Sequence, residues 1–230
     1  MQDLLDGAVR FQKEVYPAKR ELFARLAGKQ TPTALFITCA DSRIVPDMLM
    51  QCEPGDLFIC RNAGNIVPAY SGSAMGGVSA TIEYAVAALN IEHIVVLGHS
   101  DCGAMKGILH PDKVKHMPAV AAWLRHGDIA RLMIEENYPD LDEEGQLRAI
   151  IEENVIAQVE NLRTHPTVAT RLAREKIFVH GWVYNIENGS LWAFDAAEGC
   201  FVPLDGRPSP SAVRRVRRKR DADGSIAGGL

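Results

Sequence analysis

Three short apolar runs of residues that favour β-strands, separated by longer helix-like stretches, constrain the fold of this chain most. The runs extend from Ala34 to Thr38, from Leu57 to Cys60 and from Ile94 to Leu97. Between and after them, Gly76 to Asn90 and Asn154 to Arg163 have apolar residues at helical spacing. Strands that alternate with helices favour a parallel sheet covered by helices. We therefore expect an α/β fold with a mostly parallel central β-sheet flanked by helices.

The second half of the chain predicts more helix and then closing strands. Residues 117–138 and 141–163 form a helical stretch, and strands are expected at 178–186, 190–194 and 200–204. Asn188-Gly189 and Glu198-Gly199 are typical of the tight turns that join antiparallel strands. An antiparallel strand is therefore expected at one edge of the sheet.

The N-terminal stretch, residues 3–27, has apolar residues among charges at roughly helical spacing. Pro17 is expected to divide it into two helices. Because a small sheet with its own helices has no obvious place for this apolar surface, we expect it to be buried against a second subunit. The predicted organisation is a helical dimerisation arm at 1–30, an α/β domain at 31–205 and a basic tail at 206–230.

Composition places the chain among ordinary globular proteins, since 47% of its 230 residues are hydrophobic and 23% are charged. The sequence has no apolar run long enough to span a bilayer and no secretory pattern at its N-terminus. Five cysteines at irregular spacings argue against a disulfide framework and for reduced thiols. The expected location is therefore cytoplasmic, without a membrane partner.

A basic cluster near the C-terminus, residues 214–220, lies in a segment rich in Gly, Ser and Ala. It lacks the aromatic residues on which nucleic-acid bases stack. We interpret the cluster as a solvated tail, so no nucleic-acid partner is expected.

Three metal-ligating side chains follow the ends of two predicted strands. Cys39 comes directly after the first apolar run, His99 comes after the third, and Cys102 stands three residues beyond His99. The carboxyl ends of parallel strands meet at one sheet edge, and two thiolates with one imidazole are ligands that zinc prefers. Three protein ligands leave a fourth position for water or substrate, which is typical of a catalytic zinc site. The remaining cysteines, Cys52, Cys60 and Cys200, are assigned to packing.

Asp41 and Arg43 are the predicted catalytic pair, on the loop that leaves the first strand. A carboxylate held by an arginine can only accept a hydrogen bond, so it can orient a zinc-bound hydroxide toward a substrate. Asp41 is also the nearest candidate for a fourth metal ligand.

With these residues in hand, the chain resembles a β-class carbonic anhydrase from about residue 3 to about residue 204. The resemblance implies zinc on Cys39, His99 and Cys102, an orienting pair of Asp41 and Arg43, and reversible hydration of CO2 to bicarbonate and a proton. The matching motifs are Cys39-x-Asp41-x-Arg43, Glu53-Pro54-Gly55-Asp56, Arg61-Asn62-Ala63-Gly64-Asn65, Glu83-Tyr84-Ala85, His99-Ser100-x-Cys102-Gly103 and His180-Gly181-Trp182-x-Tyr184.

The resemblance extends to the substrate site of the plant-like branch. Gln30 matches a glutamine that hydrogen-bonds bicarbonate, Phe58 and Tyr84 match aromatic residues of the apolar wall, and Gly103 matches a residue whose backbone amide meets the anion. The family forms dimers in which the N-terminal arm wraps the partner. The resemblance thus implies a homo-oligomer, as a dimer or a dimer of dimers, acting on CO2 or bicarbonate.

One position departs from a branch of that family. Allosterically inhibited bacterial members carry a tryptophan three residues before the first cysteine ligand, and together with an arginine and a tyrosine it holds a noncatalytic bicarbonate. Here that position is Phe36, although Arg61 and Tyr184 match the other two. We therefore expect no regulation of this kind.

Two other functions stay open at this point. The same zinc site would also suit hydrolysis of CS2 or COS, which pocket access would decide. A noncatalytic zinc module would need a fourth permanent protein ligand, for which Asp41 is the nearby candidate.

Overall fold

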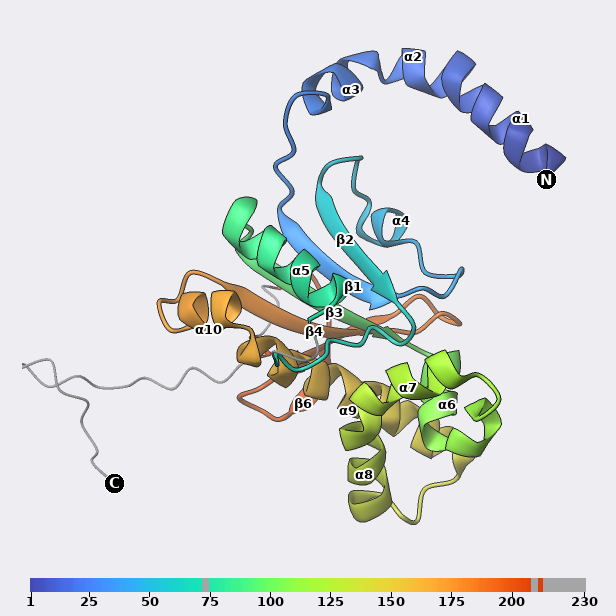
Figure 1. Ribbon diagram of the computed structural model, residues 1–230, viewed down its shortest axis with the longest axis vertical. Helices are drawn as coiled ribbons and strands as arrows, with labels where there is room; N and C mark the ends of the chain where they lie inside the picture. The colour runs from blue at the N-terminus through green and yellow to red at the C-terminus, as the bar shows by residue number, and fades with distance from the viewer. Residues whose placement is uncertain (72–74, 208–210, 213–230) are drawn as a thin grey trace, which may run out of the picture.

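A six-stranded sheet, in the order β2-β1-β3-β4-β5-β6, forms the centre of the protein in the computed structural model (Figure 1). The structure describes residues 1–71, 75–207 and 211–212. β1 pairs in parallel with β2 and β3, and β3 pairs in parallel with β4, whereas β5 and β6 run antiparallel. The predicted fold class, with β6 as an antiparallel edge strand, is confirmed. The strands are β1 Ala34–Cys39, β2 Leu57–Asn62, β3 His93–His99, β4 Phe178–Tyr184, β5 Leu191–Asp195 and β6 Cys200–Pro203.

The long helix α9 (Glu143–Thr164) packs directly on β3 and β4. Gly98 of β3 permits this close approach, because a Cβ atom there would lie 2.7 Å from a methyl carbon of Val155. Val155 is fully buried, as is most of the helix face around it. α9 is therefore fixed against the end of β3 that leads to His99.

Two further helices cover the same face of the sheet as part of one apolar cluster. They are α5 (Gly77–Glu83), which continues as a π-helical turn over Tyr84–Ala88, and α10 (Pro166–Leu172). A second cluster joins Cys39 and Cys102 to a group of helices beside α9, visible in Figure 1. These helices are α6 (Gly103–Leu109), α7 (Pro118–Leu124) and α8 (Asp128–Asn137).

The other face of the sheet carries a smaller apolar cluster. Phe36, Val95 and Leu97 of the strands pack there with Ile44 and with residues of α4 (Pro46–Met50). The Phe36 ring meets Trp182 of β4 edge-on at 6.3 Å between centroids.

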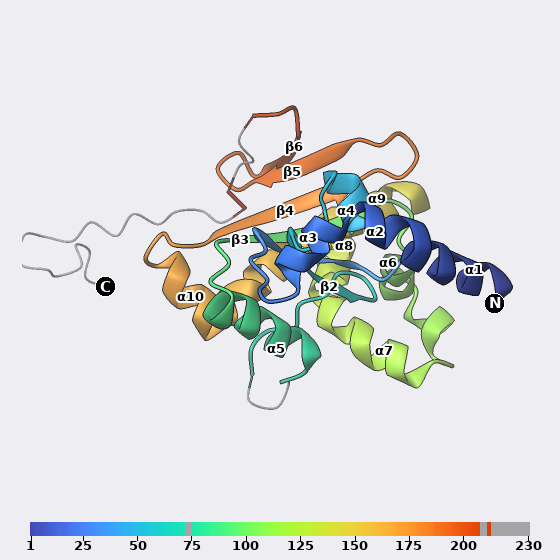
Figure 2. The same cartoon turned by 90° about the horizontal axis from the view of Figure 1, so that it is seen from above.

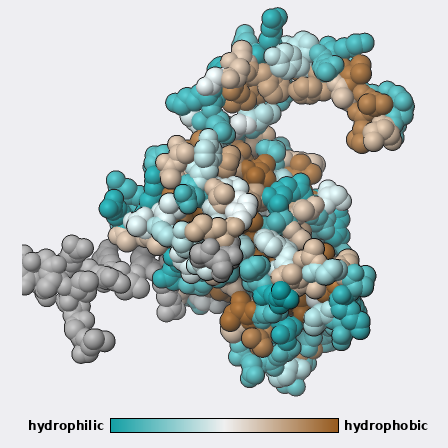
Figure 3. All heavy atoms as spheres, viewed as in Figure 1, coloured by the Kyte–Doolittle hydropathy of each residue, from teal (hydrophilic) through white to brown (hydrophobic). Residues whose placement is uncertain are grey.

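The N-terminal arm projects from the body of the protein (Figures 1 and 2). It consists of α1 (Gln2–Arg10), a π-helical turn over Phe11–Val15, α2 (Tyr16–Ala18) and α3 (Arg20–Leu26). None of its helical residues is buried, and Figure 3 shows apolar side chains along it. The arm thus presents apolar surface that nothing covers in the described part of a single chain.

The break in the arm falls at Lys19 rather than at Pro17, where the sequence predicted it. The Tyr16 amide donates to the carbonyl of Phe11, five residues back, so the helix is widened directly before the proline. This π-helical turn gives the proline ring room beside the preceding carbonyl groups.

Three other differences concern helices. The stretch expected at 117–138 is divided by a 3-10 turn at Arg125–Gly127. The short helices α4 and α10 were not predicted from the sequence. The predicted basic tail lies outside the described residues, apart from 206–207 and 211–212. Among the residues that the structure describes, no helix combines the length and apolar character needed to cross a membrane.

Candidate metal centre

Cys39 and His99 lie at one edge of the sheet because they are the last residues of two neighbouring parallel strands. Cys102 follows in the turn after β3, as the residue that precedes α6. All three side chains are buried, and their ligand atoms lie within 4.8 Å of one another. The two Sγ atoms are 4.0 Å apart, close to the roughly 3.8 Å expected for two thiolates at tetrahedral zinc–sulfur distances.

His99 presents a nitrogen that is suited to a metal ion. Its Nδ1 lies 2.8 Å from the carbonyl oxygen of Ser100, so this nitrogen donates and carries the ring proton. The other nitrogen, Nε2, is buried and has no hydrogen-bond partner among the described residues. A buried lone pair without a partner is costly, and coordination to a metal would satisfy it.

The hydrogen bond between the two sulfurs favours the thiolate form of Cys39 and holds the proton on Cys102. The pKa of Cys39 is lowered to about 4, chiefly by the hydrogen bond from Cys102, with help from the Gly64 amide. The same hydrogen bond and burial raise the pKa of Cys102. A metal ion would displace this proton, because thiolates are the binding form. Two sulfurs and one imidazole nitrogen fit zinc, which favours these softer ligands.

A glycine-containing loop after β2 supports the Cys39 sulfur. The Gly64 amide donates to Cys39 Sγ at 3.4 Å. Gly64 has φ of +85°, and a Cβ there would lie 2.8 Å from the Cβ of Ala104. Arg61, three residues earlier, donates to the carbonyl oxygens of Cys39 and Asp41 at 3.1 and 2.7 Å. The loop therefore contacts both the first ligand and the residues that follow it.

Asp41 and Arg43 form a two-pronged ion pair beside this group. Arg43 Nε donates to Asp41 Oδ1 at 3.0 Å, and Arg43 Nη2 donates to Asp41 Oδ2 at 2.8 Å. These hydrogen bonds hold the pKa of Asp41 well below its usual range. Asp41 Oδ2 lies 3.9 Å from His99 Nε2. An ionised carboxylate thus stands next to the proposed metal position.

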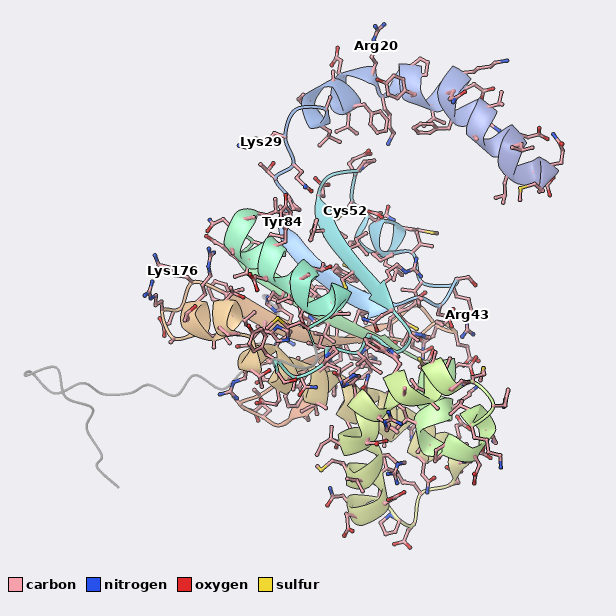
Figure 4. The ribbon with its side chains drawn as sticks, viewed as in Figure 1. Arg20, Lys29, Arg43, Cys52, Tyr84 and Lys176 are labelled. Carbon is pink, nitrogen blue, oxygen red and sulfur yellow. The ribbon has the colours of Figure 1, made fainter. Side chains whose placement is uncertain are left out.

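The structure places the predicted substrate residues in two regions. Gly103 begins α6, next to Cys102. Phe58, by contrast, pairs with Leu35 near the start of β1, about 13 Å along the strand from Cys39. Its ring lies 6.0 Å from that of Tyr84, and Figure 4 shows Tyr84 and Arg43 in separate parts of the molecule.

Gln30 is exposed in the segment that leads into β1. It therefore approaches the amino end of the strand, whereas Cys39 is at the carboxyl end. One chain does not bring Gln30, Phe58 and Tyr84 to the metal centre.

Sequence reasoning missed a buried ladder of side-chain amides on α9. Asn154 Nδ2 donates to the Gly64 carbonyl at 3.1 Å, and Gln158 Nε2 donates to Asn154 Oδ1 at 2.9 Å. Gln158 Oε1 accepts from the Val67 amide at 2.8 Å, and Asn161 donates to the Val67 carbonyl at 2.9 Å. The ladder holds the loop whose Gly64 amide contacts Cys39. The sequence signal for this ladder is the pair Asn154 and Gln158, two amide residues four positions apart on an otherwise apolar helix face.

Comparison with known proteins identifies the family. Residues 34–191 match the family model described as carbonic anhydrase. The chain therefore belongs to the carbonic anhydrase family, in its β class, and it is an enzyme of that kind. The general reaction of this family is CO2 hydration.

Related proteins match this chain over nearly its whole length. The carbonic anhydrase of Pseudomonas aeruginosa is 52% identical over 213 residues, which cover 93% of this chain and 96% of that protein. Carbonic anhydrase 1 of Escherichia coli O157:H7 is 51% identical with the same coverage. The solved β-carbonic anhydrase CcaA is 41% identical, with a TM-score of 0.88 over 92% of this chain and 95% of that one. One of two β-carbonic anhydrases of Sordaria macrospora, described as tetrameric, is 30% identical, with a TM-score of 0.76 over 87% of this chain and 98% of that one.

Proposed function

We propose that this protein catalyses the reversible hydration of CO2 to bicarbonate and a proton, with one zinc ion held by Cys39, His99 and Cys102. One observation carries the proposal: the buried Nε2 of His99 has no partner in the described chain and lies within 4.8 Å of two thiol sulfurs. The ionised Asp41 beside it supplies the polar group that a reaction at this position needs.

When bound, the zinc would act as a Lewis acid that activates a water molecule as the nucleophile. Asp41 has no proton to give, so it can only accept a hydrogen bond from the attacking water and thereby aim the oxygen lone pair at the carbon of CO2. Arg43 fixes the plane of the carboxylate with two parallel hydrogen bonds. As the new C–O bond forms, one C=O electron pair moves onto oxygen, where we assign the backbone amide of Gly103 as a hydrogen-bond donor. The proton that the water gives up passes to solvent or buffer.

The rest of the substrate pocket would come from a second copy of the chain. We assign Gln30, Phe58 and Tyr84 to substrate contacts across a subunit boundary. Two observations support this: within one chain these residues lie at the opposite end of the strands from the metal centre, and Tyr84 is 49% exposed. Tyr84 also borders a pocket of about 580 Å³ along α5. The exposed apolar arm supports assembly as a dimer or a dimer of dimers, and a cytoplasmic location stays a prediction.

Zinc analysis and stopped-flow CO2 hydration, for the wild type and Asp41→Asn, test the proposal. We expect one zinc per chain in both, and a turnover number about 10- to 100-fold lower in the variant, as is typical for groups that orient a metal ligand. Asp205→Asn is the matched control, since Asp205 also pairs with an arginine two residues later, at 2.7 Å, but outside the metal centre. Full turnover of zinc-loaded Asp41→Asn would refute the assignment, and zinc without CO2 hydration in the wild type would refute the function.

A further inference from the structure

Asp101 occupies the turn between two of the proposed metal ligands, His99 and Cys102. Its backbone has φ of +58°, in the left-handed region that few side chains other than those of Asn and Asp adopt readily. From this turn Asp101 reaches the loop that follows β1. Arg43 Nη1 donates to Asp101 Oδ2 at 2.9 Å, and Arg43 Nη2 donates to the Asp101 carbonyl oxygen at 3.2 Å.

These contacts nearly saturate the guanidinium group of Arg43. Of its five N–H bonds, two serve the Asp41 carboxylate and two more serve Asp101. The guanidinium is planar and rigid, so hydrogen bonds at one end fix the direction of the other end. The orientation of Asp41 is therefore tied to Asp101 through Arg43.

Asp101 is itself held from the opposite side. Lys106 of α6 forms an ion pair with Asp101 Oδ1, the oxygen that Arg43 does not use. The chain of alternating charges thus runs from α6 through the turn after β3 to the loop after β1. The side chains of Arg43 and Asp101 are 43% and 53% exposed. A single exposed ion pair contributes little stability, so one contact alone would hold Arg43 weakly.

We propose that Asp101 is a positioning residue for the reaction, which holds Arg43 so that the Asp41 carboxylate faces the metal centre. This inference rests on the proposed function of Asp41 and Arg43. Without the Asp101 carboxylate, Arg43 keeps only the backbone carbonyl of residue 101 as a second anchor, and Asp41 samples orientations that do not aim the nucleophile. Turnover then falls, while zinc content and the KM for CO2 stay close to those of the wild type.

Asp101→Gly tests the proposal without straining the turn, because glycine accepts a positive φ readily. We expect the turnover number to fall about 3- to 10-fold, less than the 10- to 100-fold typical of direct outer-shell contacts to a ligand. Asp101→Asn keeps an acceptor for Arg43 but loses the charge, so it should lose less turnover than Asp101→Gly. Glu175→Gly is the matched control, since Glu175 is another exposed acidic residue with positive φ, 53°.

A double-mutant cycle with Arg43→Met separates positioning from a general structural effect. If Asp101 acts through Arg43, Asp101→Gly causes no further loss of turnover in the Arg43→Met background. Additive losses, unchanged turnover in Asp101→Gly, or zinc lost in parallel with turnover would each overturn the inference. If Asp101→Gly does not fold, Asp101→Asn enters the same cycle with the same criteria.

The cycle also distinguishes this inference from the proposed function. Wild-type turnover in Arg43→Met would overturn the role of the Asp41 and Arg43 pair, and the inference would fall with it. A strong loss of turnover in Arg43→Met, together with unchanged turnover in Asp101→Gly, would overturn the inference about Asp101 but leave the proposed function standing.

Discussion

Asn154→Ala should weaken both the fold and the metal centre, because Asn154 is the buried link between α9 and the Gly64 loop. Asn154 is 1% exposed, and its side chain makes two hydrogen bonds. Its removal leaves the Gly64 carbonyl and Gln158 Nε2 without these partners in a region closed to solvent. Gln158 is fully buried, so no solvent contact compensates directly.

The size of the effect follows from these two groups. A buried polar group that loses its hydrogen bond costs about 1 to 3 kcal/mol, so two cost about 2 to 6 kcal/mol. Alanine has a higher helix propensity than asparagine, which offsets about 0.5 kcal/mol of this cost. The expected net loss is about 1.5 to 5.5 kcal/mol, a large part of the 5 to 15 kcal/mol that is typical of a folded domain.

Urea unfolding of metal-free protein, followed by tryptophan fluorescence at one protein concentration, measures this loss without the contribution of zinc binding. Chelator competition measures zinc affinity, which should fall about 10-fold because the Gly64 amide no longer holds the Cys39 sulfur firmly. Asn137→Ala, at an exposed position of α8, is the matched control. A loss below 1 kcal/mol, together with unchanged zinc affinity, would refute the reasoning.

Two further predictions concern regulation and assembly. Phe36 is buried against Trp182, and Arg61 donates to two backbone carbonyls. We therefore expect activity at neutral pH without inhibition by bicarbonate. A cooperative loss of activity below pH 8 that shifts with added bicarbonate, measured in pH–rate profiles, would contradict this expectation. Deletion of residues 1–27 should reduce the assembled mass in light scattering and lower CO2 hydration together, because the arm would no longer hold the neighbouring chain that contributes Gln30 and Tyr84. A fully active monomer would count against that account.

The sheet and the meeting of Cys39, His99 and Cys102 at one edge were predictable because their signals are local. Apolar runs of residues that favour strands mark β1, β2 and β3, and parallel pairing of β1 with β3 brings Cys39 and His99 to one edge without further information. The short α4, of five residues, contains too little of a helical period to be recognised. The break at Arg125–Gly127 includes Gly127, a weak helix former whose effect periodicity alone does not reveal.

The contacts of Asp101 and Asn154 around the metal centre were not predictable, because they join residues far apart in the chain. Asp101 contacts a residue 58 positions away, and Asn154 contacts one 90 positions away. An aspartate in a turn and an asparagine in a helix have many ordinary structural uses. Their partners become visible only when the loops after β1, β2 and β3 meet at the same edge.

The contacts made by the α9 amides and those made by Asp101 lie in different environments. We therefore expect them to have different effects on the site. The amide ladder from α9 is buried and uncharged, so its hydrogen bonds are strong, insensitive to salt and directed at the loop that supports a metal ligand. The Lys106–Asp101–Arg43 chain is exposed and ionic, so each link is weak and screened by salt, and it is directed at the carboxylate of Asp41. Under the proposed function, rigid contacts hold the metal ion, while the group assigned to aim the nucleophile is held by contacts that solvent can loosen. We therefore expect retention of the metal and rate of turnover to change independently.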